Sequence, residues 1–142
     1  MASSVLFVCL GNICRSPMAD AIARHRFPKV RSDSAGTAAY HEGEPADPRT
    51  LEVLSRHGIA YDGRARKVRV ADFGRFDWVL AMDHSNLANL RRICPADHAD
   101  KVRLVLEPLG PDREVGDPYY GGRSGFDTAY RELNEAIGHW LG

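Results

Sequence analysis

Residues 5–17 read Val-Leu-Phe-Val-Cys-Leu-Gly-Asn-Ile-Cys-Arg-Ser-Pro, and this stretch decides how the rest of the chain is interpreted. Residues 5–8 form an uninterrupted apolar run, which is typical of a central strand covered on both faces. Pro17 suits the first position of a helix and Ser16 suits the cap before it, so we expect a helix to begin here. Residues 9–15 therefore form a loop between a buried strand and a helix N-terminus.

The composition of this loop is typical of an anion-binding site. A loop of this length can curl so that its backbone N–H groups and the positive end of the helix dipole point at one centre. Gly11 permits a positive φ, and Asn12 is one of the few other residue types that tolerate it. The predicted phosphate-binding residues are those that follow Cys9, together with the serine at the helix start: Leu10, Gly11, Asn12, Ile13, Cys14 and Ser16.

Cys9 and Arg15 supply the chemistry that such a site needs. The positive potential and the donated hydrogen bonds stabilise a thiolate at Cys9, which is the nucleophilic form of cysteine. The planar guanidinium of Arg15 can hold two phosphate oxygens at once. The Ser16 hydroxyl can donate a hydrogen bond to the sulfur and ease its departure in a second step.

A lone cysteine is more often a buried core residue, and Cys-x5-Arg alone is a weak pattern. The strand, the Gly-Asn turn, the arginine, the serine and the helix-starting proline stand here in one register, and together they favour a phosphate loop. Cys9 and Cys14 have no ligand-spaced Cys or His pair that could complete a metal site, so we expect no metal.

The remaining sequence alternates between strand and helix patterns. Strands are predicted at 30–34, 78–82 and 102–106. One helix is predicted from Pro17, with Met18, Ala21, Ile22 and His25 on one face. Further helices are predicted from Asp47-Pro48 to Gly58, through Leu87 and Leu90, and over 126–141. This alternation predicts an α/β fold in which a four-stranded parallel sheet has helices on both faces, in three layers. Ligands of such folds bind beyond the carboxyl ends of the strands, where residues 9–15 lie.

The length and the charge balance of the chain restrict the possible functions further. The 142 residues suffice for one core, so a single domain over residues 1–142 is expected. Lys and Arg number 19, as do Asp and Glu, with no run of one sign, which argues against nucleic-acid or membrane-surface partners. Neither a secretory signal nor an apolar span of about 20 residues is present. Three cysteines do not make a disulfide framework, so we expect a cytoplasmic protein with reduced thiols.

The stretch from Val8 to Pro17 resembles the signature of the low-molecular-weight protein-tyrosine phosphatases. Three further segments resemble parts of that family in the same order: Ser34-Ala35-Gly36-Thr37, Ala81-Met82-Asp83-His84-Ser85-Asn86 and Asp117-Pro118-Tyr119-Tyr120-Gly121. The resemblance implies the phosphotyrosine phosphatase I-like fold and hydrolysis of phosphotyrosine in proteins and of small aryl phosphates. It also implies that Cys9 is the nucleophile, Arg15 binds the phosphoryl group and Asp117 donates the proton. It implies no cofactor, and the oligomeric state stays open.

Residue chemistry supports Asp117 as the acid and base. Pro118 keeps the backbone before it extended, so the Asp117 side chain can project from a loop. A phosphate dianion nearby favours the protonated form of this carboxyl group. Asp83 is the competing carboxylate, but its position before a helical pattern makes it an N-cap.

Tyrosines are the expected walls of the pocket. Tyr40, Tyr119 and Tyr120 are the candidates for gripping an aromatic ring, and one or two of them are expected to touch the substrate. A deep slot favours phosphotyrosine over the shorter phosphoserine, whose phosphate would not reach the floor.

The resemblance also implies supporting roles around the loop. Cys14 is either a small residue at the helix start that faces the core or, as the resemblance implies, a partner that pairs with the nucleophile under oxidation and shields it from irreversible steps. Ser34 hydrogen-bonds into the phosphate loop and holds Asn12 in its strained conformation. Family members commonly carry a histidine where this chain has Gly63, so we expect that network to be thinner or filled by water.

Two other functions stay open at this point. An arsenate reductase on the same scaffold relays oxidation through two further cysteines, and only Cys94 remains outside the loop. A phosphocarrier that holds phosphate on a cysteine would not need Arg15 and Asp117 together. Asp72-Phe73-Gly74 spells a kinase motif, but no glycine-rich loop with a following lysine accompanies it, so helix and turn are expected there.

Overall fold

The computed structural model describes residues 2–119 and 121–142, and its centre is a four-stranded parallel sheet. The strands are β1 (Ser4–Cys9), β2 (Arg31–Gly36), β3 (Trp78–Ala81) and β4 (Val102–Leu104), in the spatial order β2-β1-β3-β4. β1 lies between two neighbours, so Phe7 pairs with both Ser34 and Leu80. This central position explains why the apolar run of β1 is buried on both faces.

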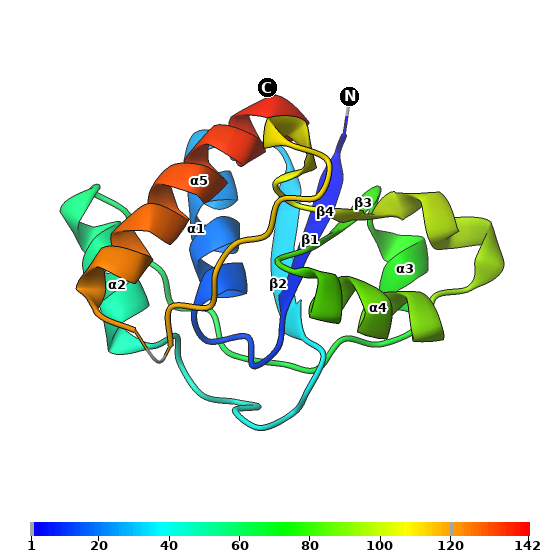
Figure 1. The fold of residues 1–142 in the computed structure, drawn as a ribbon, viewed down its shortest axis with the longest axis horizontal. Helices are drawn as coiled ribbons and strands as arrows, with labels where there is room; N and C mark the ends of the chain where they lie inside the picture. The colour runs from blue at the N-terminus through cyan, green and yellow to red at the C-terminus, as the bar shows by residue number, and fades with distance from the viewer. Residues whose placement is uncertain (1, 120) are drawn as a thin grey trace.

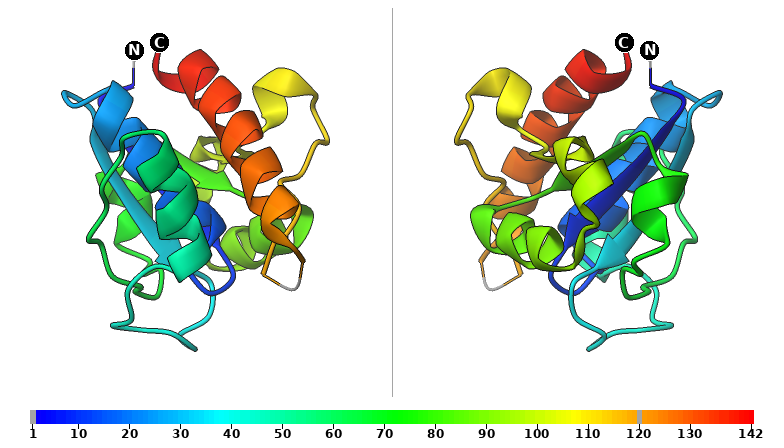
Figure 2. Two further views of the ribbon diagram at one scale, coloured as in Figure 1. Left: turned by 90° about the vertical axis from the view of Figure 1, so that its left-hand side faces the viewer. Right: turned by 90° about the vertical axis from the view of Figure 1, so that its right-hand side faces the viewer.

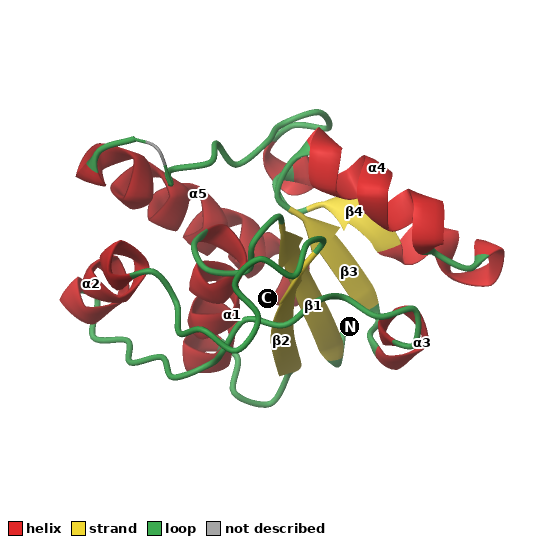
Figure 3. Cartoon of the chain, turned by 90° about the horizontal axis from the view of Figure 1, so that it is seen from below, coloured by secondary structure: helices red, strands yellow, loops and turns green. Residues whose placement is uncertain are grey.

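Helices cover both faces of the sheet, as predicted (Figure 1). One face carries α1 (Arg15–Arg26), α2 (Pro48–Arg56) and α5 (Arg123–Leu141), and the other carries α3 (Asp72–Arg75) and α4 (His84–Ile93) (Figure 3). Two short 3-10 helices, η1 (Ala96–Lys101) and η2 (Glu107–Leu109), flank β4. The predicted three-layer arrangement is therefore confirmed.

Alternate residues of β1 face two separate cores. Val5 and Phe7 belong to the cluster that packs against α1 and α5, whereas Leu6 and Val8 belong to the cluster with Phe73 of α3. This follows from the two-residue period of a strand. Each large apolar side chain that is fully buried contributes about 1.5–3 kcal/mol.

Several predicted boundaries move. β2 continues to Gly36, because Ala35 and Gly36 pair with the end of β1. β4 ends at Leu104, because the chain then turns into η2. The predicted N-cap of α4 is confirmed, because Asp83 accepts a hydrogen bond from a backbone N–H of that helix. Asp47, where the second helix was predicted to start, caps α2 in the same way.

The start of α1 differs from the prediction in two respects. The helix begins at Arg15, so Ser16 is an interior helix residue with a fully buried side chain rather than a cap. His25 is exposed, although it was predicted to share one face of the helix with Met18, Ala21 and Ile22, which are buried. Residues 15–23 are all buried, because α1 packs on the sheet and beside both α2 and α5. Only its last turn reaches solvent.

The loops that follow the strands gather at one end of the molecule. The loop after β1, the segment after β2 and the segment before α5 lie together there, and β1 starts and α5 ends at the opposite end (Figures 1 and 2). Within residues 2–119 and 121–142, none of the helices combines the length and apolarity that crossing a bilayer requires.

Candidate active site

A pocket of about 170 Å³ opens at this loop end, beyond the carboxyl end of β1. Every residue that lines it was predicted from the sequence except His41. The lining residues are Cys9, Leu10, Gly11, Ile13, Cys14, Arg15, Tyr40, His41, Asp117 and Tyr119. Tyr120, also predicted, lies outside the described residues. Among the residues that are described, no three His, Cys, Asp or Glu side chains are grouped so that they could hold a metal ion.

The Cys9 sulfur lies at the floor of this pocket and is held by polar groups of the loop. It accepts a hydrogen bond from the Asn12 backbone N–H at 3.3 Å and lies 2.9 Å from the Ser16 hydroxyl. Asn12 has a positive φ of 59°, as predicted, and its side-chain amide donates to the Ser16 hydroxyl at 2.7 Å. The Ser16 hydroxyl has the Cys9 sulfur at 2.9 Å and the Ala35 carbonyl at 3.5 Å as acceptors for its own proton, and the sulfur is the nearer of the two. These donors stabilise a thiolate.

Arg15 is buried beside the sulfur and is held by two acceptors. Its Nη1 donates to Asp83 Oδ2 at 2.8 Å and to the Val115 carbonyl at 2.9 Å. Its side chain is only 3% exposed, so the guanidinium is fixed rather than mobile. Asp83 thus caps α4 with one oxygen and orients Arg15 with the other. The cap was predicted, whereas the contact with Arg15 was not.

Asp117 approaches the same guanidinium from the loop before α5. Its Oδ2 lies 3.7 Å from Arg15 Nη2, and its Oδ1 accepts the backbone N–H of Tyr119 at 3.0 Å, which forms an Asx turn. The side chain is 41% exposed. The Asp117 carboxyl group therefore lines the pocket at its solvent-exposed side. From there it could give its proton to a molecule bound deeper in the pocket.

Aromatic side chains form part of the wall. Tyr40 and Tyr119 both line the pocket; Tyr40 is 76% exposed, and the Tyr119 ring centroid lies 6.5 Å from that of His41. The His41 ring also approaches Gly11, where a Cβ would come within 3.1 Å of it. His41 was missed because no local pattern distinguishes it from an ordinary loop histidine.

Comparison with known proteins identifies the family of this chain. The family model of the low molecular weight phosphotyrosine protein phosphatases matches residues 4–142. The chain belongs to this family. It is 49% identical to the low molecular weight phosphotyrosine protein phosphatase of Schizosaccharomyces pombe, over 91% of this chain and 88% of that protein. With the human enzyme it shares 41% identity, over 91% and 87% of the two chains.

Solved structures agree. A protein tyrosine phosphatase of Entamoeba histolytica with Hepes in its active site superposes with a TM-score of 0.90 at 39% identity, over 97% of this chain and 94% of that one. Vibrio vulnificus Wzb in complex with benzylphosphonate superposes with a TM-score of 0.91 at 28% identity, over 99% and 98%. The predicted activity is confirmed at this level: the chain is a protein-tyrosine phosphatase, a phosphoric monoester hydrolase.

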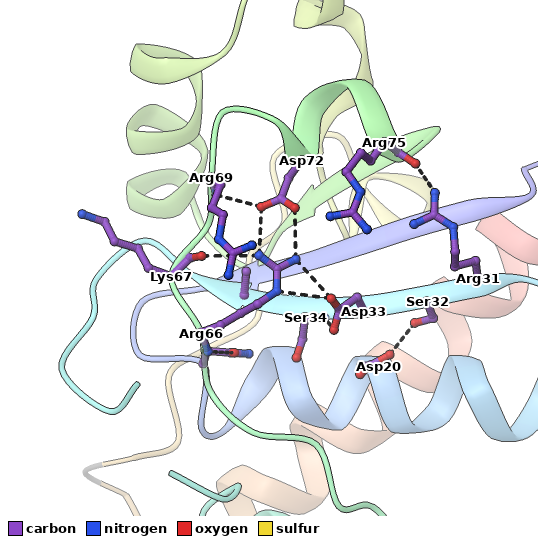
Figure 4. Close-up of polar contacts among 12 residues, drawn as sticks. Asp20, Arg31, Ser32, Asp33, Ser34, Arg66, Lys67, Arg69, Asp72 and Arg75 are labelled. Carbon is purple, nitrogen blue, oxygen red and sulfur yellow. Dashed lines mark hydrogen bonds and ion pairs between the residues drawn. The ribbon is translucent and has the colours of Figure 1, made fainter. Parts of the chain in front are cut away.

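In this phosphatase, the strained Asn12 is anchored by the segment before α3. Its Oδ1 accepts the Arg66 backbone N–H at 3.0 Å. The Arg66 guanidinium forms two hydrogen bonds with Asp72, at 2.9 and 3.1 Å, and reaches Asp33 of β2 at 3.1 Å (Figure 4). Asp72 is 1% exposed and also accepts the Arg69 backbone N–H. Arg66 is therefore held by the buried carboxylate of Asp72 and by Asp33, and its backbone N–H, which anchors Asn12, is held with it.

Ser34 does not anchor Asn12, contrary to expectation. Among the described residues, the Ser34 hydroxyl has Tyr61 as its partner, at 3.4 Å, and the Tyr61 hydroxyl donates to buried Asp20 at 2.7 Å. A Cβ at Gly63 would overlap the Tyr61 phenol. The Tyr61 side chain therefore occupies the space beside Gly63, where we expected fewer hydrogen bonds or a water molecule. Burial raises the pKa of Tyr61, which keeps its hydroxyl protonated as a donor.

Gly36 permits the close approach of β2 to the phosphate loop. A Cβ there would lie 2.7 Å from the Leu10 carbonyl oxygen and 3.2 Å from Asn12 Cβ. Directly after it, the Thr37 N–H donates to the Cys9 carbonyl at 2.9 Å, and the Ala38 N–H donates to the Leu10 carbonyl at 3.0 Å. The carbonyls of Cys9 and Leu10 are therefore paired with the segment after β2. They are not available to repel an anion in the pocket.

The second cysteine of the loop has a different environment from the first. Burial raises the pKa of Cys14 to about 12, and the negative charge of Asp47 adds to the shift. Near neutral pH Cys14 therefore stays a thiol, whereas Cys9 has donors aimed at its sulfur. A brief pulse of iodoacetate should carboxymethylate Cys9 and spare Cys14, as read by peptide mass mapping.

Inorganic phosphate, which competes for the same cradle, should slow this labelling, and Cys9→Ser should remove it. Labelling of Cys14 ahead of Cys9 in the folded protein would contradict this assignment.

Proposed function

We propose that this phosphatase removes phosphate from phosphotyrosine in proteins through a phosphocysteine intermediate on Cys9. The observation that carries the proposal is the convergence of three groups on one pocket: the Cys9 sulfur with its donors, the fixed guanidinium of Arg15, and Asp117 3.7 Å from that guanidinium. Backbone N–H groups and Arg15 stabilise the negative charge of the transferring phosphoryl group. No metal is needed for this.

In the first step the Cys9 thiolate attacks phosphorus. The S–P bond forms while the bond from phosphorus to the tyrosine oxygen breaks, and protonated Asp117 gives its proton to the leaving phenolate. The position of Asp117 at the mouth of the pocket supports this role, because the phenolic oxygen lies above the bound phosphoryl group. Tyrosine leaves as the neutral phenol, and Asp117 is left as a carboxylate.

In the second step water attacks the phosphocysteine. Asp117 accepts a proton from the water, an O–P bond forms, and the S–P bond breaks to release inorganic phosphate. The sulfur departs as a thiolate, which the hydroxyl of Ser16, 2.9 Å away, stabilises by hydrogen bonding. Asp117 is again protonated and Cys9 again ionised, so the cycle closes.

The depth and the walls of the pocket support an aryl substrate. Tyr40 and Tyr119 can contact a ring whose phosphate rests on the floor, and Leu10, 42% exposed, adds apolar surface. The structurally similar Wzb of Vibrio vulnificus binds benzylphosphonate, a ring joined to a phosphonate.

Two matched phosphopeptides that differ only in phosphotyrosine against phosphoserine test this substrate class. Two ring contacts of about 0.5–1.5 kcal/mol each correspond to a preference of about 5- to 150-fold in kcat/KM for phosphotyrosine. Tyr119→Ala should reduce that preference. Equal rates on both peptides would rule out recognition of the ring.

The rival functions have less support. Cys94 packs against the cluster on the opposite face of the sheet from Cys9 and Cys14, so it is poorly placed for an arsenate reductase relay. A phosphocarrier would have no use for Asp117 beside Arg15. The cytoplasm, where thiols stay reduced, is the compartment we propose for an enzyme with a cysteine nucleophile.

A further inference from the structure

Arg49, in the first turn of α2, contacts the loop that carries Asp117, and the mechanism above does not use it. Its guanidinium lies over the Tyr119 ring, 5.5 Å from the centroid, and over the Phe126 ring, 4.6 Å from the centroid. Its Nη1 also donates to the Gly121 carbonyl at 3.4 Å. The Arg49 side chain thus contacts two residues of the loop, Tyr119 and Gly121, and also Phe126 of the helix that follows.

Arg49 is itself fixed in place by Asp47. The Asp47 carboxylate accepts from Arg49 Nε at 3.1 Å and from Nη2 at 3.0 Å, and it accepts the Arg49 backbone N–H at 2.8 Å. Burial acts to raise the pKa of Asp47, but the side-chain and backbone hydrogen bonds from Arg49 outweigh it and lower that pKa. The carboxylate therefore stays charged and keeps the arginine oriented.

The same turn of α2 is bonded to the phosphate loop. The Asp47 backbone N–H donates to the Ile13 carbonyl at 2.8 Å, and the Thr50 hydroxyl donates to the Cys14 carbonyl at 3.3 Å. The first turn of α2 therefore touches the floor of the pocket directly and the loop of the acid through Arg49. In Figure 1, α2 stands beside the start of α5, where that loop ends.

We propose that Arg49 is a positioning residue that sets the Asp117 carboxyl group over the phosphate loop; this inference rests on the proposed role of Asp117. Asp117 is half-exposed, and its Oδ1 is held by the Tyr119 backbone N–H. By clamping the Tyr119 ring and the Gly121 carbonyl, Arg49 holds the turn in which that N–H lies. Loss of the clamp lets the acid move away from the leaving group while the nucleophile stays in place.

The dependence of rate on the leaving group tests this, because a displaced acid matters most for a basic phenolate. We compare kcat/KM, which covers transfer to Cys9, for phenyl phosphate and p-nitrophenyl phosphate. Arg49→Met should slow phenyl phosphate by about 10- to 100-fold, the usual effect of misplacing a group by about 1 Å. It should slow p-nitrophenyl phosphate much less, and Arg49→Lys should restore only part of the loss.

Arg56→Met is the matched control. Arg56 lies at the other end of α2 and pairs with Asp127 of α5 at 2.8 Å. The control variant therefore removes an arginine that joins the same two helices, but at a site away from the loop that carries Asp117. It should leave the ratio of the two substrates unchanged. Equal slowing of both substrates by Arg49→Met, or the same ratio as in Arg56→Met, would overturn the inference.

Asp117→Asn in the same assay separates the two proposals. If Asp117→Asn shows a steep leaving-group dependence and Arg49→Met does not, the positioning role is wrong and the acid role stands. If Asp117→Asn shows none, the acid role is wrong and the positioning role falls with it. In an Asp117→Asn background, Arg49→Met should have no further effect on the substrate ratio.

Discussion

Cys9→Ser should abolish turnover of p-nitrophenyl phosphate, with a loss of roughly 10⁶-fold in kcat, the scale that follows removal of the nucleophile from a covalent hydrolase. The reason lies in the surroundings of the sulfur. An N–H of Asn12 and the hydroxyl of Ser16 are placed to stabilise a thiolate, and a serine hydroxyl in that position does not ionise. Among the described residues, the hydrogen-bond partners of the sulfur are Ser16 and Asn12, and no histidine or lysine forms a hydrogen bond with it that could remove its proton. Release of p-nitrophenol measures the effect directly.

Two observations should accompany this loss. Cys9→Ser should still bind inorganic phosphate in a calorimetric titration, because the loop N–H groups and Arg15 remain. Cys14→Ser, the matched control in the same loop, should still turn over substrate steadily, because the buried Cys14 thiol, with its raised pKa, is not the group that attacks phosphorus. Residual steady turnover in Cys9→Ser would show that the phosphoryl group does not pass through this sulfur.

Local patterns were sufficient for the elements of the fold and for the floor of the site. The apolar run at residues 5–8 and the positive φ of Asn12 follow from constraints that act within a few positions, and the structure confirms both. Gly11, which was also expected to permit a positive φ, does not have one. The start of α1 was less predictable from the sequence. Ser16 has the chemistry of a cap, but its hydroxyl is used by Cys9 and Asn12 instead.

Contacts between distant segments were the part that local patterns did not reveal. Asp83 orients Arg15 across 68 positions, and the Arg66 backbone holds Asn12 across 54. Asp72 belongs to a tripeptide that resembles a kinase motif, yet its burial and its pairing with Arg66 show an anchor for the phosphate loop. Each depends on which strand ends become neighbours, and that is set by the order of the strands rather than by any short stretch of sequence.

These distant contacts also explain how the loop keeps its shape. A residue other than glycine at positive φ is strained and persists only where its surroundings hold it. Asn12 is held on both sides of its amide, by Ser16 and by the Arg66 N–H. The strain turns its own N–H toward the sulfur. Packing far from the pocket thereby maintains the donors on which the nucleophile depends.

Asp117→Asn should lower kcat/KM for phenyl phosphate by roughly 10²–10⁴-fold, the usual contribution of a general acid. The amide keeps the size of the side chain and its contact with the Tyr119 N–H but has no proton to give. The loss should be smaller for p-nitrophenyl phosphate, whose phenolate leaves without protonation.

Asp83→Asn is the control that separates acid catalysis from orientation of Arg15. Both carboxylates approach the same guanidinium, Asp83 at 2.8 Å and Asp117 at 3.7 Å. The Asp83 carboxylate orients the Arg15 guanidinium through a hydrogen bond to Nη1. Loss of that carboxylate should therefore weaken binding of inorganic phosphate and slow both aryl phosphates alike. If instead Asp83→Asn steepened the dependence on the leaving group and Asp117→Asn left it unchanged, the two assignments would have to be exchanged.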